Sequence, residues 1–522
     1  MISVGTQFLK NAVTSWLGIV LSIGITFFFT PYLISELGKD RYGVWTLAFS
    51  LLAYMKLADM GMGQSIVRYI SKYLANKEWE QLNSVISSAA RLYMLVAVIT
   101  LATVLLIALG VLRLMQIPAD LFRTAQWVVI ILGIRQTLFF ITLPFVSLGA
   151  FHRFDIINYF NVGSYVLQTV LMVVLLETGF GLAAMALLIL ALDSMSFFWR
   201  HKIRRKLFPE VHYSREASSP EKTRELLGYG LYSVLIMVAW TVILQTDNIV
   251  IAGFISTEAV ALYSIPALMV FQLRNTVKTI TVPLIPAVSH YEALQDFAKV
   301  REVFARSTRY MYFVATFFCV AVLLFGGAFM VLWVGPDFAQ SRRVLYVLMM
   351  GVTFTLPLLI GNAVLLGISR HRLTFYLVGS EAIANIVLSV ILVKTLGVIG
   401  VALGTAIPQL ILYIVIYPIV FHRALQANLG TFYKRAGKSV LFAAVPLLPV
   451  AYATRRALPP TSWFALIADC ILVSALAAVI LFAFILIPED RSKIRAAARR
   501  HLPGGRKAPT QSRSPKGECV NQ

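Results

Sequence analysis

Long apolar runs, separated by short polar segments, extend along almost the whole chain. In helical form, about 20 apolar residues rising 1.5 Å each cross a hydrocarbon core of roughly 30 Å. Backbone groups in hydrocarbon must bond within their own segment, so each run is predicted to be a helix. This pattern predicts about fourteen spans. They are Ala12–Ile34, Tyr42–Met62, Ala89–Leu112, Ala125–Leu148, Asn158–Leu176, Leu182–Phe198, Leu231–Phe254, Ala259–Val277, Tyr310–Val334, Val344–Ile368, Leu373–Val393, Val398–Val420, Ser439–Ala453 and Trp463–Ile487.

Composition favours an all-α polytopic membrane protein over a soluble one. The 522-residue chain is 59% hydrophobic and 13% charged, whereas a soluble domain carries about 25% charged residues. The first run is too long for a cleaved signal peptide, and no small-x-small site follows it before Glu36. We therefore expect it to remain as the first span. The run at Ser439–Ala453 is the shortest, and Pro446 and Pro449 interrupt it.

The basic residues lie mostly on one side of the predicted membrane. The chain has 46 Lys and Arg and a net charge of +22. With the N-terminus inside, 35 of them lie in or beside cytoplasmic segments and 9 in outer loops, and Lys56 and Arg135 lie within spans. This asymmetry predicts that both termini are cytoplasmic, in the inner (cytoplasmic) cell membrane. The clusters at 200–206 and 491–516 are expected to contact anionic membrane lipids, not nucleic acid.

The chain repeats itself at an offset of 218 residues. Matched pairs include Ser71 and Ser289, Tyr73 and Tyr291, Arg91 and Arg309, Gly149 and Gly367, Gly179 and Gly397, and Lys56 and Arg274. The repeat unit holds six spans, an even number, so the two copies are expected to be parallel six-helix lobes. The predicted units are an N-lobe (1–199), a cytoplasmic linker (200–225), a C-lobe (226–434), two additional C-terminal helices (435–487) and a basic tail (488–522) expected to be disordered. Two such lobes suit alternating access, with a site between them near the midplane.

Ionisable side chains inside spans are costly, so they usually face a cavity or a partner. The candidates are Lys56, Asp59, Arg135, Asp193, Asp247, Arg274, Lys278 and Glu381. Lys56 and Asp59 are three residues apart and can pair. Arg274 and Lys278 lie near a span end, where snorkelling is the alternative to a site. Arg135 lies mid-span without a carboxylate on its own helix, which favours a cavity role over pairing with a neighbouring helix.

Two spans present polar faces at helical spacing. Asn161, Tyr165 and Gln168 share a face of the fifth span, and Glu381 and Asn385 share one of the eleventh. Such faces either bind sugar hydroxyls or hold helices together. Asp193 and Asp247 are candidates to carry a coupling proton, since burial makes a carboxylate easier to protonate. For Asp247, solvation near the outer interface is the alternative.

No motif indicates an enzyme or a cofactor. The chain has no Gly-rich phosphate loop with Lys, no His-Glu-x-x-His and no Gly-x-Ser-x-Gly. Its three cysteines predict neither disulfides nor a metal site. A membrane glycan polymerase or ligase would need a large outer loop with catalytic residues, and the predicted outer loops are short.

Three stretches resemble a known family. They are Leu37-Gly38 with Tyr42-Gly43-Val44-Trp45, Asp59-Met60-Gly61-Met62-Gly63 with Arg68-Tyr69, and Asp247 to Phe254 followed by Val260-Ala261-Leu262-Tyr263. Together with the span count and duplication, they make the chain similar to the Wzx-type polysaccharide or O-antigen flippases of the multidrug/oligosaccharidyl-lipid/polysaccharide exporter superfamily. Ala261 departs from the glycine usual in that family.

The resemblance implies translocation of an undecaprenyl-diphosphate-linked oligosaccharide across the cytoplasmic membrane. The pyrophosphate needs cations, which Arg135, Lys56 and Arg274 would supply between the lobes. An ion gradient would drive transport, and other polysaccharide assembly proteins are further expected partners. Two alternatives within the superfamily stay open: an ion-coupled multidrug antiporter, which would need an acidic, aromatic cavity, and a flippase for lipid-linked peptidoglycan precursor.

Overall fold

The computed structural model describes residues 4–145, 154–227, 231–281, 283–426 and 428–492, and these segments contain helices and no strand. The α-helices are α1 Val4–Ala53, α2 Met62–Ala75, α3 Trp79–Leu109, α4 Ala119–Thr142, α5 Phe154–Glu177, α6 Leu182–Leu207, α7 Pro220–Leu227, α8 Leu231–Phe254, α9 Thr257–Thr281, α10 Leu284–Ala293, α11 Phe297–Val334, α12 Arg342–Gly367, α13 His371–Ile411, α14 Tyr417–Leu425, α15 Leu429–Ala457 and α16 Trp463–Ile480. Short 3₁₀ or π segments are η1 Tyr54–Asp59, η2 Val111–Leu114, η3 Leu143–Phe145, η5 Pro336–Ser341, η6 Leu412–Ile416 and η7 Leu481–Ile485.

The helices account for the fourteen predicted spans. Eleven helical stretches of the described chain are long and apolar enough to cross a membrane. Two of them each hold two spans, because α1 turns back at Gly38 (φ 74°) and α13 at Gly397 (φ 59°). α9, at 25 residues, supplies the remaining span although it is more polar. The prediction of an all-α polytopic membrane protein is therefore confirmed.

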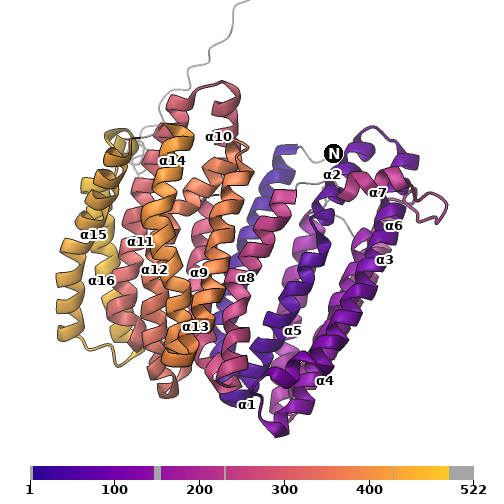
Figure 1. Ribbon diagram of the computed structural model, residues 1–522, viewed down its shortest axis with the longest axis horizontal. Helices are drawn as coiled ribbons and strands as arrows, with labels where there is room; N and C mark the ends of the chain where they lie inside the picture. The colour runs from indigo at the N-terminus through magenta and orange to yellow at the C-terminus, as the bar shows by residue number, and fades with distance from the viewer. Residues whose placement is uncertain (1–3, 146–153, 228–230, 282, 427, 493–522) are drawn as a thin grey trace, which may run out of the picture.

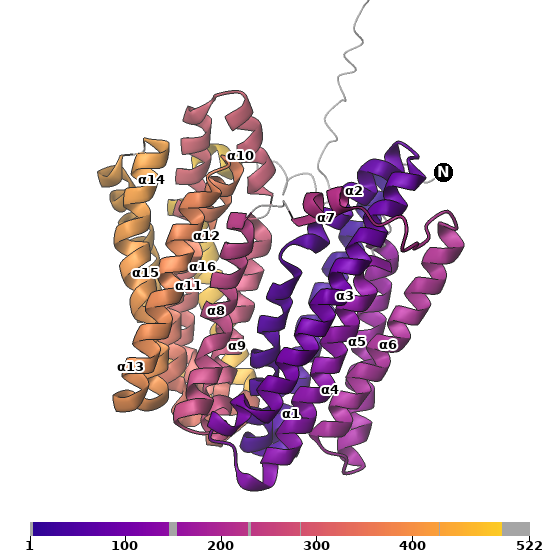
Figure 2. The same ribbon diagram turned by 45° about the vertical axis from the view of Figure 1, so that its right-hand side comes forward.

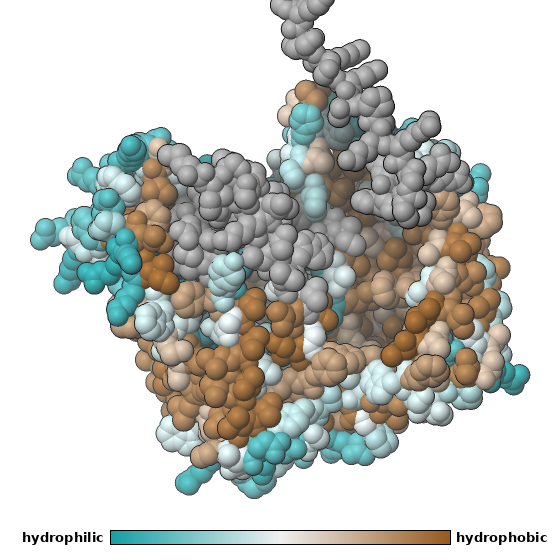
Figure 3. Space-filling model, turned by 180° about the vertical axis from the view of Figure 1, so that it is seen from behind, coloured by the Kyte–Doolittle hydropathy of each residue, from teal (hydrophilic) through white to brown (hydrophobic). Residues whose placement is uncertain are grey.

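The helices form two groups side by side. In Figures 1 and 2, α1 to α6 lie on one side and α8 to α14 on the other, while α15 and α16 pack outside the second group against α11. The two groups are splayed at the end where α2, α7 and α10 lie, here called the linker end, and they converge at the opposite, far end. Figure 3 shows an apolar band across the middle of the molecule, with hydrophilic residues gathered at both ends, as expected of a membrane-spanning bundle.

Polar contacts join the two groups at the far end. Lys39 Nζ lies 3.3 Å from a carboxylate oxygen of Glu258 and 3.7 Å from one of Asp337. The Thr257 hydroxyl donates to Asp40 Oδ1 at 2.8 Å. These contacts lie around the Gly38 turn and the start of α9, so they close the far end.

Three spans differ in detail from the prediction. The second span does not end as one α-helix, because η1 and the left-handed residues Met60 and Gly61 separate its α1 part from α2. The thirteenth, α15, is a continuous helix of 29 residues despite Pro446 and Pro449. The twelfth widens into the π segment η6 shortly after Pro408, which removes one backbone donor.

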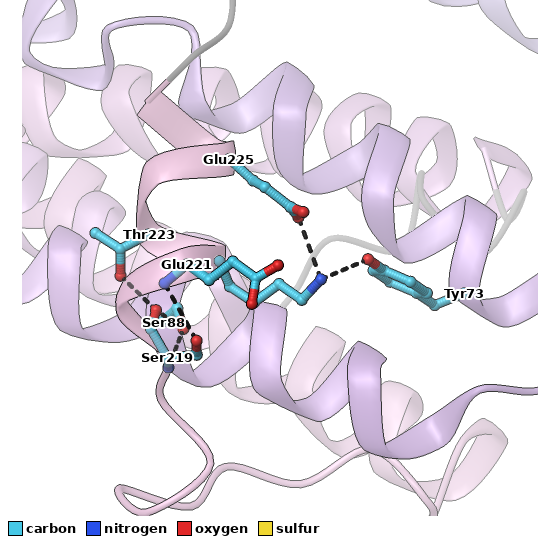
Figure 4. A network of polar contacts seen from close by, with 7 residues as sticks. Tyr73, Ser88, Ser219, Glu221, Thr223 and Glu225 are labelled. Carbon is cyan, nitrogen blue, oxygen red and sulfur yellow. Dashed lines mark hydrogen bonds and ion pairs between the residues drawn. The ribbon is translucent and has the colours of Figure 1, made fainter.

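Residues 208–227, which include α7, dock on α2 and α3 (Figure 4). Lys222 Nζ donates to the Tyr73 hydroxyl at 2.8 Å and to Glu225 at 3.3 Å. The Ser219 amide donates to the Ser88 hydroxyl at 2.9 Å. The hydrogen bond to Tyr73, followed by the one to Glu225, raises the pKa of Lys222 above its usual value. Its contribution to docking is therefore complete below the ordinary lysine pKa and is lost only in strongly alkaline solution.

The predicted polar linker at 200–225 is partly helical, because α6 continues to Leu207 and α7 begins at Pro220. Of the predicted disordered tail, residues 493–522 lie outside the described residues. The boundaries of the two lobes remain a proposal from the internal repeat.

Candidate functional site

Two neighbouring cavities lie where the two helix groups face each other. The larger has a volume of about 550 Å³ and is lined by α8, α9, α10, α12 and α13, with Gly61 and Gln64 from the other group. The smaller, of about 240 Å³, lies between the second half of α1 and α8, α9, α12 and α13. Leu244, Phe271 and Arg274 border both, so Arg274 stands at the junction of the two cavities.

The side chain of Arg274 is buried at this junction and does not snorkel. Its guanidinium lies over the Trp240 ring, 5.0 Å from the centroid, and only 9% of the residue is exposed. Its Nη2 is buried without a hydrogen-bond partner in the described chain. Lys278, one turn away, is exposed and lines the larger cavity. The snorkelling alternative is wrong for Arg274, because Trp240 holds the guanidinium inside the bundle.

A buried carboxylate lies near Arg274. Glu381 on α13 is 1% exposed, and it accepts hydrogen bonds from Gln409 Nε2 at 3.2 Å and the Tyr413 hydroxyl at 2.9 Å. It also interacts electrostatically with Arg274. The attraction compensates only part of the guanidinium's charge, because no ion pair within 4.0 Å forms between them. The Arg274 guanidinium thus keeps one buried donor without a partner at the junction of the two cavities.

Asp247 forms a second buried polar cluster on α8, facing α13. It is 4% exposed, so solvation at the outer interface, the alternative drawn from the sequence, is wrong. The Thr405 hydroxyl donates to its Oδ2 at 2.6 Å, and Tyr263 donates to the same oxygen. Asn385 Nδ2 and the Ser389 hydroxyl lie 3.3 and 3.4 Å from Oδ1. This carboxylate is surrounded by neutral donors, and no cationic side chain of the described chain pairs with it.

Arg135 forms an ion pair across two helices of the first group. Its Nε lies 2.6 Å from Asp193 Oδ2, with 33% and 42% of the two side chains exposed. The sequence favoured a cavity role for Arg135 over a partner on a neighbouring helix, but α6 does supply such a partner. A cavity role for Arg135 stays a prediction. Lys56 and Arg200 interact electrostatically with this pair. Arg135 and Arg200 are attracted to Asp193, whereas Lys56 is repelled by Arg135, so the cluster of three cations and one carboxylate is positive overall.

Lys56 and Asp59 do not pair, although their spacing allowed it. They lie in the 3₁₀ segment η1, where Lys56 is exposed. Asp59 instead accepts a hydrogen bond from the Tyr93 hydroxyl. It accepts another from the Gly63 amide, whose nitrogen lies 3.2 Å from Asp59 Oδ1. Asp59 therefore fixes the start of α2 against α3, and the ammonium of Lys56 stays without a carboxylate partner in the described chain.

The polar face predicted on the fifth span lies apart from both cavities. Asn161 is exposed, and Gln168 Nε2 donates to the Met172 sulfur on its own helix, at 3.9 Å. Tyr165 shares a hydrogen bond of 3.1 Å with Thr26 of α1. Of the two readings drawn from the sequence, this face favours holding helices together over binding sugar.

Sequence reasoning missed the partners of the two buried carboxylates. Ser389 continues the face of Glu381 and Asn385 on α13, and a second face with the same spacing of four carries Thr405, Gln409, Tyr413 and Tyr417. The two faces meet across the Gly397 turn. Spacing alone could have identified this pair of polar faces, whereas Trp240 carries no such signal.

Exchanging the charges of the Arg135–Asp193 pair tests whether it is structural. Under the export activity that the sequence resemblance implies, Arg135→Ala is expected to abolish transport while the protein still reaches the membrane, because Asp193 loses its cation. The double variant Arg135→Asp with Asp193→Arg restores the ion pair, and we expect it to recover much of the export if the pair only joins α4 and α6. Surface polysaccharide in a complemented deletion strain is the measurement. No recovery, with normal membrane levels, would assign Arg135 a direct contact with substrate.

The described chain thus has fourteen membrane-spanning segments in two groups, with cavities between the groups and buried charged side chains on the cavity walls, which is the architecture of a multi-pass membrane transporter. The chain belongs to the family described as polysaccharide biosynthesis protein, whose profile matches residues 8–292.

Two sequence relatives match most of the chain, and one of them carries a transporter name. A putative O-antigen transporter of Shigella flexneri is 21% identical over 403 residues, covering 76% of this chain and 94% of that protein. The uncharacterized membrane protein EpsK of Bacillus subtilis is 23% identical over 516 residues, covering 95% and 98%. These matches confirm the resemblance to Wzx-type members of the exporter superfamily.

Two kinds of solved structure share the fold. The lipid II flippase MurJ in an inward closed conformation aligns with a TM-score of 0.67 at 15% identity, covering 91% of this chain and 99% of that one. An inward-facing multidrug resistance transporter of the MATE family aligns with a TM-score of 0.59 at 17% identity, covering 77% and 95%. At these identities the likeness establishes the fold alone.

Proposed function

We propose that this protein is a flippase that moves an undecaprenyl-diphosphate-linked oligosaccharide from the inner to the outer leaflet of the cytoplasmic membrane. The observation that carries the proposal is the Arg274 guanidinium, buried between the two helix groups with an unused donor. A buried cation without a full counter-charge favours an anionic ligand, and a pyrophosphate has oxygens in the geometry that a guanidinium fork binds.

The larger cavity supplies the groups that such a head group needs. Lys278 adds a second cation beside Arg274, and Asn362 and Gln64 add amide groups that can bond to sugar hydroxyls. Trp240 offers an aromatic face to a sugar ring. Lys56 and the Arg135 cluster in the first group are candidates for guiding the pyrophosphate toward Arg274. The polyprenyl chain would stay in lipid while the polar head crosses between the groups.

Alternating access accounts for movement across the membrane. The groups are splayed at the linker end, and at the far end they meet through the ion pairs of Lys39 with Glu258 and Asp337 and through apolar residues of α1 packed against α9. Breaking these exposed ion pairs costs little, since such pairs contribute about 0–1 kcal/mol each. Substrate would enter from the linker end, and the reverse splaying would release it at the far end.

An ion gradient is the proposed energy source, with Asp247 as the coupling group. Its carboxylate is buried among neutral donors, and Asn385 Oδ1 nearby lacks a partner. Either a proton on Asp247 or a monovalent cation held by these oxygens would neutralise the carboxylate. Glu381 is a second candidate, but Arg274 already offsets part of its charge.

Two other cargoes remain as alternatives. A multidrug antiporter would bind cationic drugs, for which the positive charges of Arg274, Lys278 and Lys56 are unfavourable. A lipid-linked peptidoglycan precursor carries the same pyrophosphate, and the likeness to MurJ in fold leaves that cargo open. The O-antigen transporter name of one relative favours a polysaccharide repeat unit.

Lipid-linked repeat units in a deletion strain test the function. We expect them to accumulate on the cytoplasmic face of the membrane, with loss of surface polysaccharide, because the upstream assembly continues without export. Leaflet-selective chemical labelling of extracted lipids is the measurement. Unchanged lipids with an altered drug sensitivity would instead support the antiporter, and arrested cell-wall synthesis would support the peptidoglycan precursor.

The orientation can be tested with single cysteines after replacing the three native ones. The linker end is proposed to be cytoplasmic, since it carries the predicted inside segments. Glu210→Cys is therefore expected to react with a membrane-impermeant maleimide only after the cells are permeabilised. Thr461→Cys, between α15 and α16 at the far end, is expected to react in intact cells. The reverse pattern would invert the topology.

A further inference from the structure

A pocket outside the transport path lies at the linker end of α3 and α4. It has a volume of about 360 Å³, and one side is lined by Tyr213, Arg215 and Ser218 of the docked segment before α7. The other sides are lined by Arg91 of α3 and by apolar side chains of α3, α4 and η3. These apolar residues are Ala90, Met94, Leu95, Val98, Ile141 and Phe145. The lining contains two arginines and no acidic residue.

Both arginines of this pocket are available to a ligand. Arg91 and Arg215 are exposed, and neither forms an ion pair or side-chain hydrogen bond within the described chain. The Tyr213 ring is held edge-on against Phe145 at 6.0 Å, which fixes its place in the pocket lining. Two free guanidiniums in one pocket favour a bound phosphate group.

An apolar stripe on α3 begins at the pocket and runs toward the far end. Leu95, Ile99 and Leu106 are 58%, 53% and 66% exposed, and Met94 and Val98 lie beside them. Their spacing of three and four residues places them on one face of the helix. A ligand with an anionic head at Arg91 and a long apolar chain would cover this face.

The equivalent face of the second group is covered by other helices. Phe313, Phe317 and Leu324, each 218 residues after the α3 positions, pack against α15 and α16. Arg309, the counterpart of Arg91, donates from Nη2 to the Phe484 carbonyl at 3.0 Å, near the end of α16. In the second group two additional spans thus cover the stripe and bond to the arginine, whereas no described helix does so on α3.

We propose that an anionic glycerophospholipid occupies this place on α3. Its phosphate binds Arg91 and Arg215 beneath the docked segment, and an acyl chain lies along Leu95, Ile99 and Leu106. Bulk zwitterionic lipid would cover the stripe equally well but would leave two guanidiniums competing with its own positively charged head group. The bound lipid would also hold the segment before α7 against α3, adding to the contacts of Lys222 and Ser219.

Native mass spectrometry of the full-length protein in detergent tests the proposal. Phosphatidylglycerol is titrated against phosphatidylcholine of the same chains, and inorganic phosphate is added separately. We expect the wild type to bind at least one phosphatidylglycerol preferentially and not to release it to millimolar phosphate. The double variant Arg91→Gln with Arg215→Gln should weaken this binding about 30-fold, since each basic residue contributes about 1 kcal/mol at an anionic membrane.

A matched double variant controls for net charge. Arg224→Gln with Arg435→Gln removes two exposed arginines from the linker side of the chain without touching the pocket, and its lipid binding should equal that of the wild type. Leu95→Ser should weaken phosphatidylglycerol and not phosphate, which separates a lipid from a free anion. Equal binding by both double variants, or no preference over phosphatidylcholine, would overturn the proposal. So would a dimer that the Arg91 and Arg215 changes dissociate, because a second copy would then cover the stripe.

Discussion

Arg274→Ala is expected to reduce export at least about 30-fold while the protein still reaches the membrane. The guanidinium is buried with an unused donor between the helix groups, and truncating one partner of a buried charged contact costs about 2–5 kcal/mol. Arg274→Lys should recover little, because an ammonium cannot reproduce the planar fork that stacks on Trp240 and binds two phosphate oxygens. The measurement is surface polysaccharide together with accumulated lipid-linked repeat units in a complemented deletion strain.

Two controls separate substrate binding from a structural role of Arg274. Arg372 also stacks on an aromatic ring, 5.6 Å from the Tyr376 centroid, but outside both cavities, so Arg372→Ala should export normally. Arg274 also offsets the charge of Glu381, so Arg274→Ala combined with Glu381→Gln removes the buried charge that would be left. Recovery of export in that double variant would show that Arg274 only neutralises Glu381.

Asp247→Asn is expected to abolish the proposed gradient-driven export with little loss of folded protein. The amide keeps the size of the side chain, and the hydroxyls of Thr405, Tyr263 and Ser389 can rotate to accept from it. It cannot take up a proton or neutralise a cation. Purified wild-type protein should gain several degrees of thermal stability from its coupling ion, because an ion at 100 times its Kd stabilises by about 2.7 kcal/mol.

The melting temperature therefore identifies the ion. The melting temperature is measured in sodium chloride and in potassium chloride at fixed pH, and in a separate pH series at fixed salt. The melting temperature of Asp247→Asn should not respond to whichever ion couples. Asp469→Asn is the matched control, because Asp469 is 0% exposed in α16 but lies away from both cavities. Full export by Asp247→Asn, or an unchanged ion response, would remove Asp247 from the coupling step.

The fold class could be read from the sequence because the bilayer imposes one rule on every span. Each apolar run must be a helix of a certain length, so hydropathy and basic-residue placement suffice for number and order. The break in the second span was not predictable in this way. Asp59 there bonds to Tyr93 and to the Gly63 amide, and both contacts depend on how α3 lies beside α2.

The sequence showed which charged residues are candidates for the site, but not how they are arranged. A charge in an apolar run is visible in sequence, so Arg274, Asp247, Glu381 and Arg135 were all found. Whether each one binds a ligand, pairs or snorkels depends on a neighbouring helix: Trp240 keeps Arg274 inside, and Asp193 pairs with Arg135. Asn161 and Gln168 share a helix face, as their spacing predicted, but this face lies apart from both cavities. Helical spacing does not give the rotation of a helix about its own axis, so it cannot say toward which neighbour a face points.

The turn at Gly38 has a mechanical consequence. Its φ of 74° and ψ of 169° are open almost only to glycine, and a Cβ there would meet no atom within 4 Å, so the backbone conformation alone requires this residue. One residue joins the first span to the stretch that carries Tyr42 and Ser50 on the wall of the smaller cavity. No slack chain separates them. If the first span tilts in the membrane, either φ and ψ of Gly38 must change or the second half of α1 must move with it. In the second case the wall of the smaller cavity that faces Asp247 moves as well.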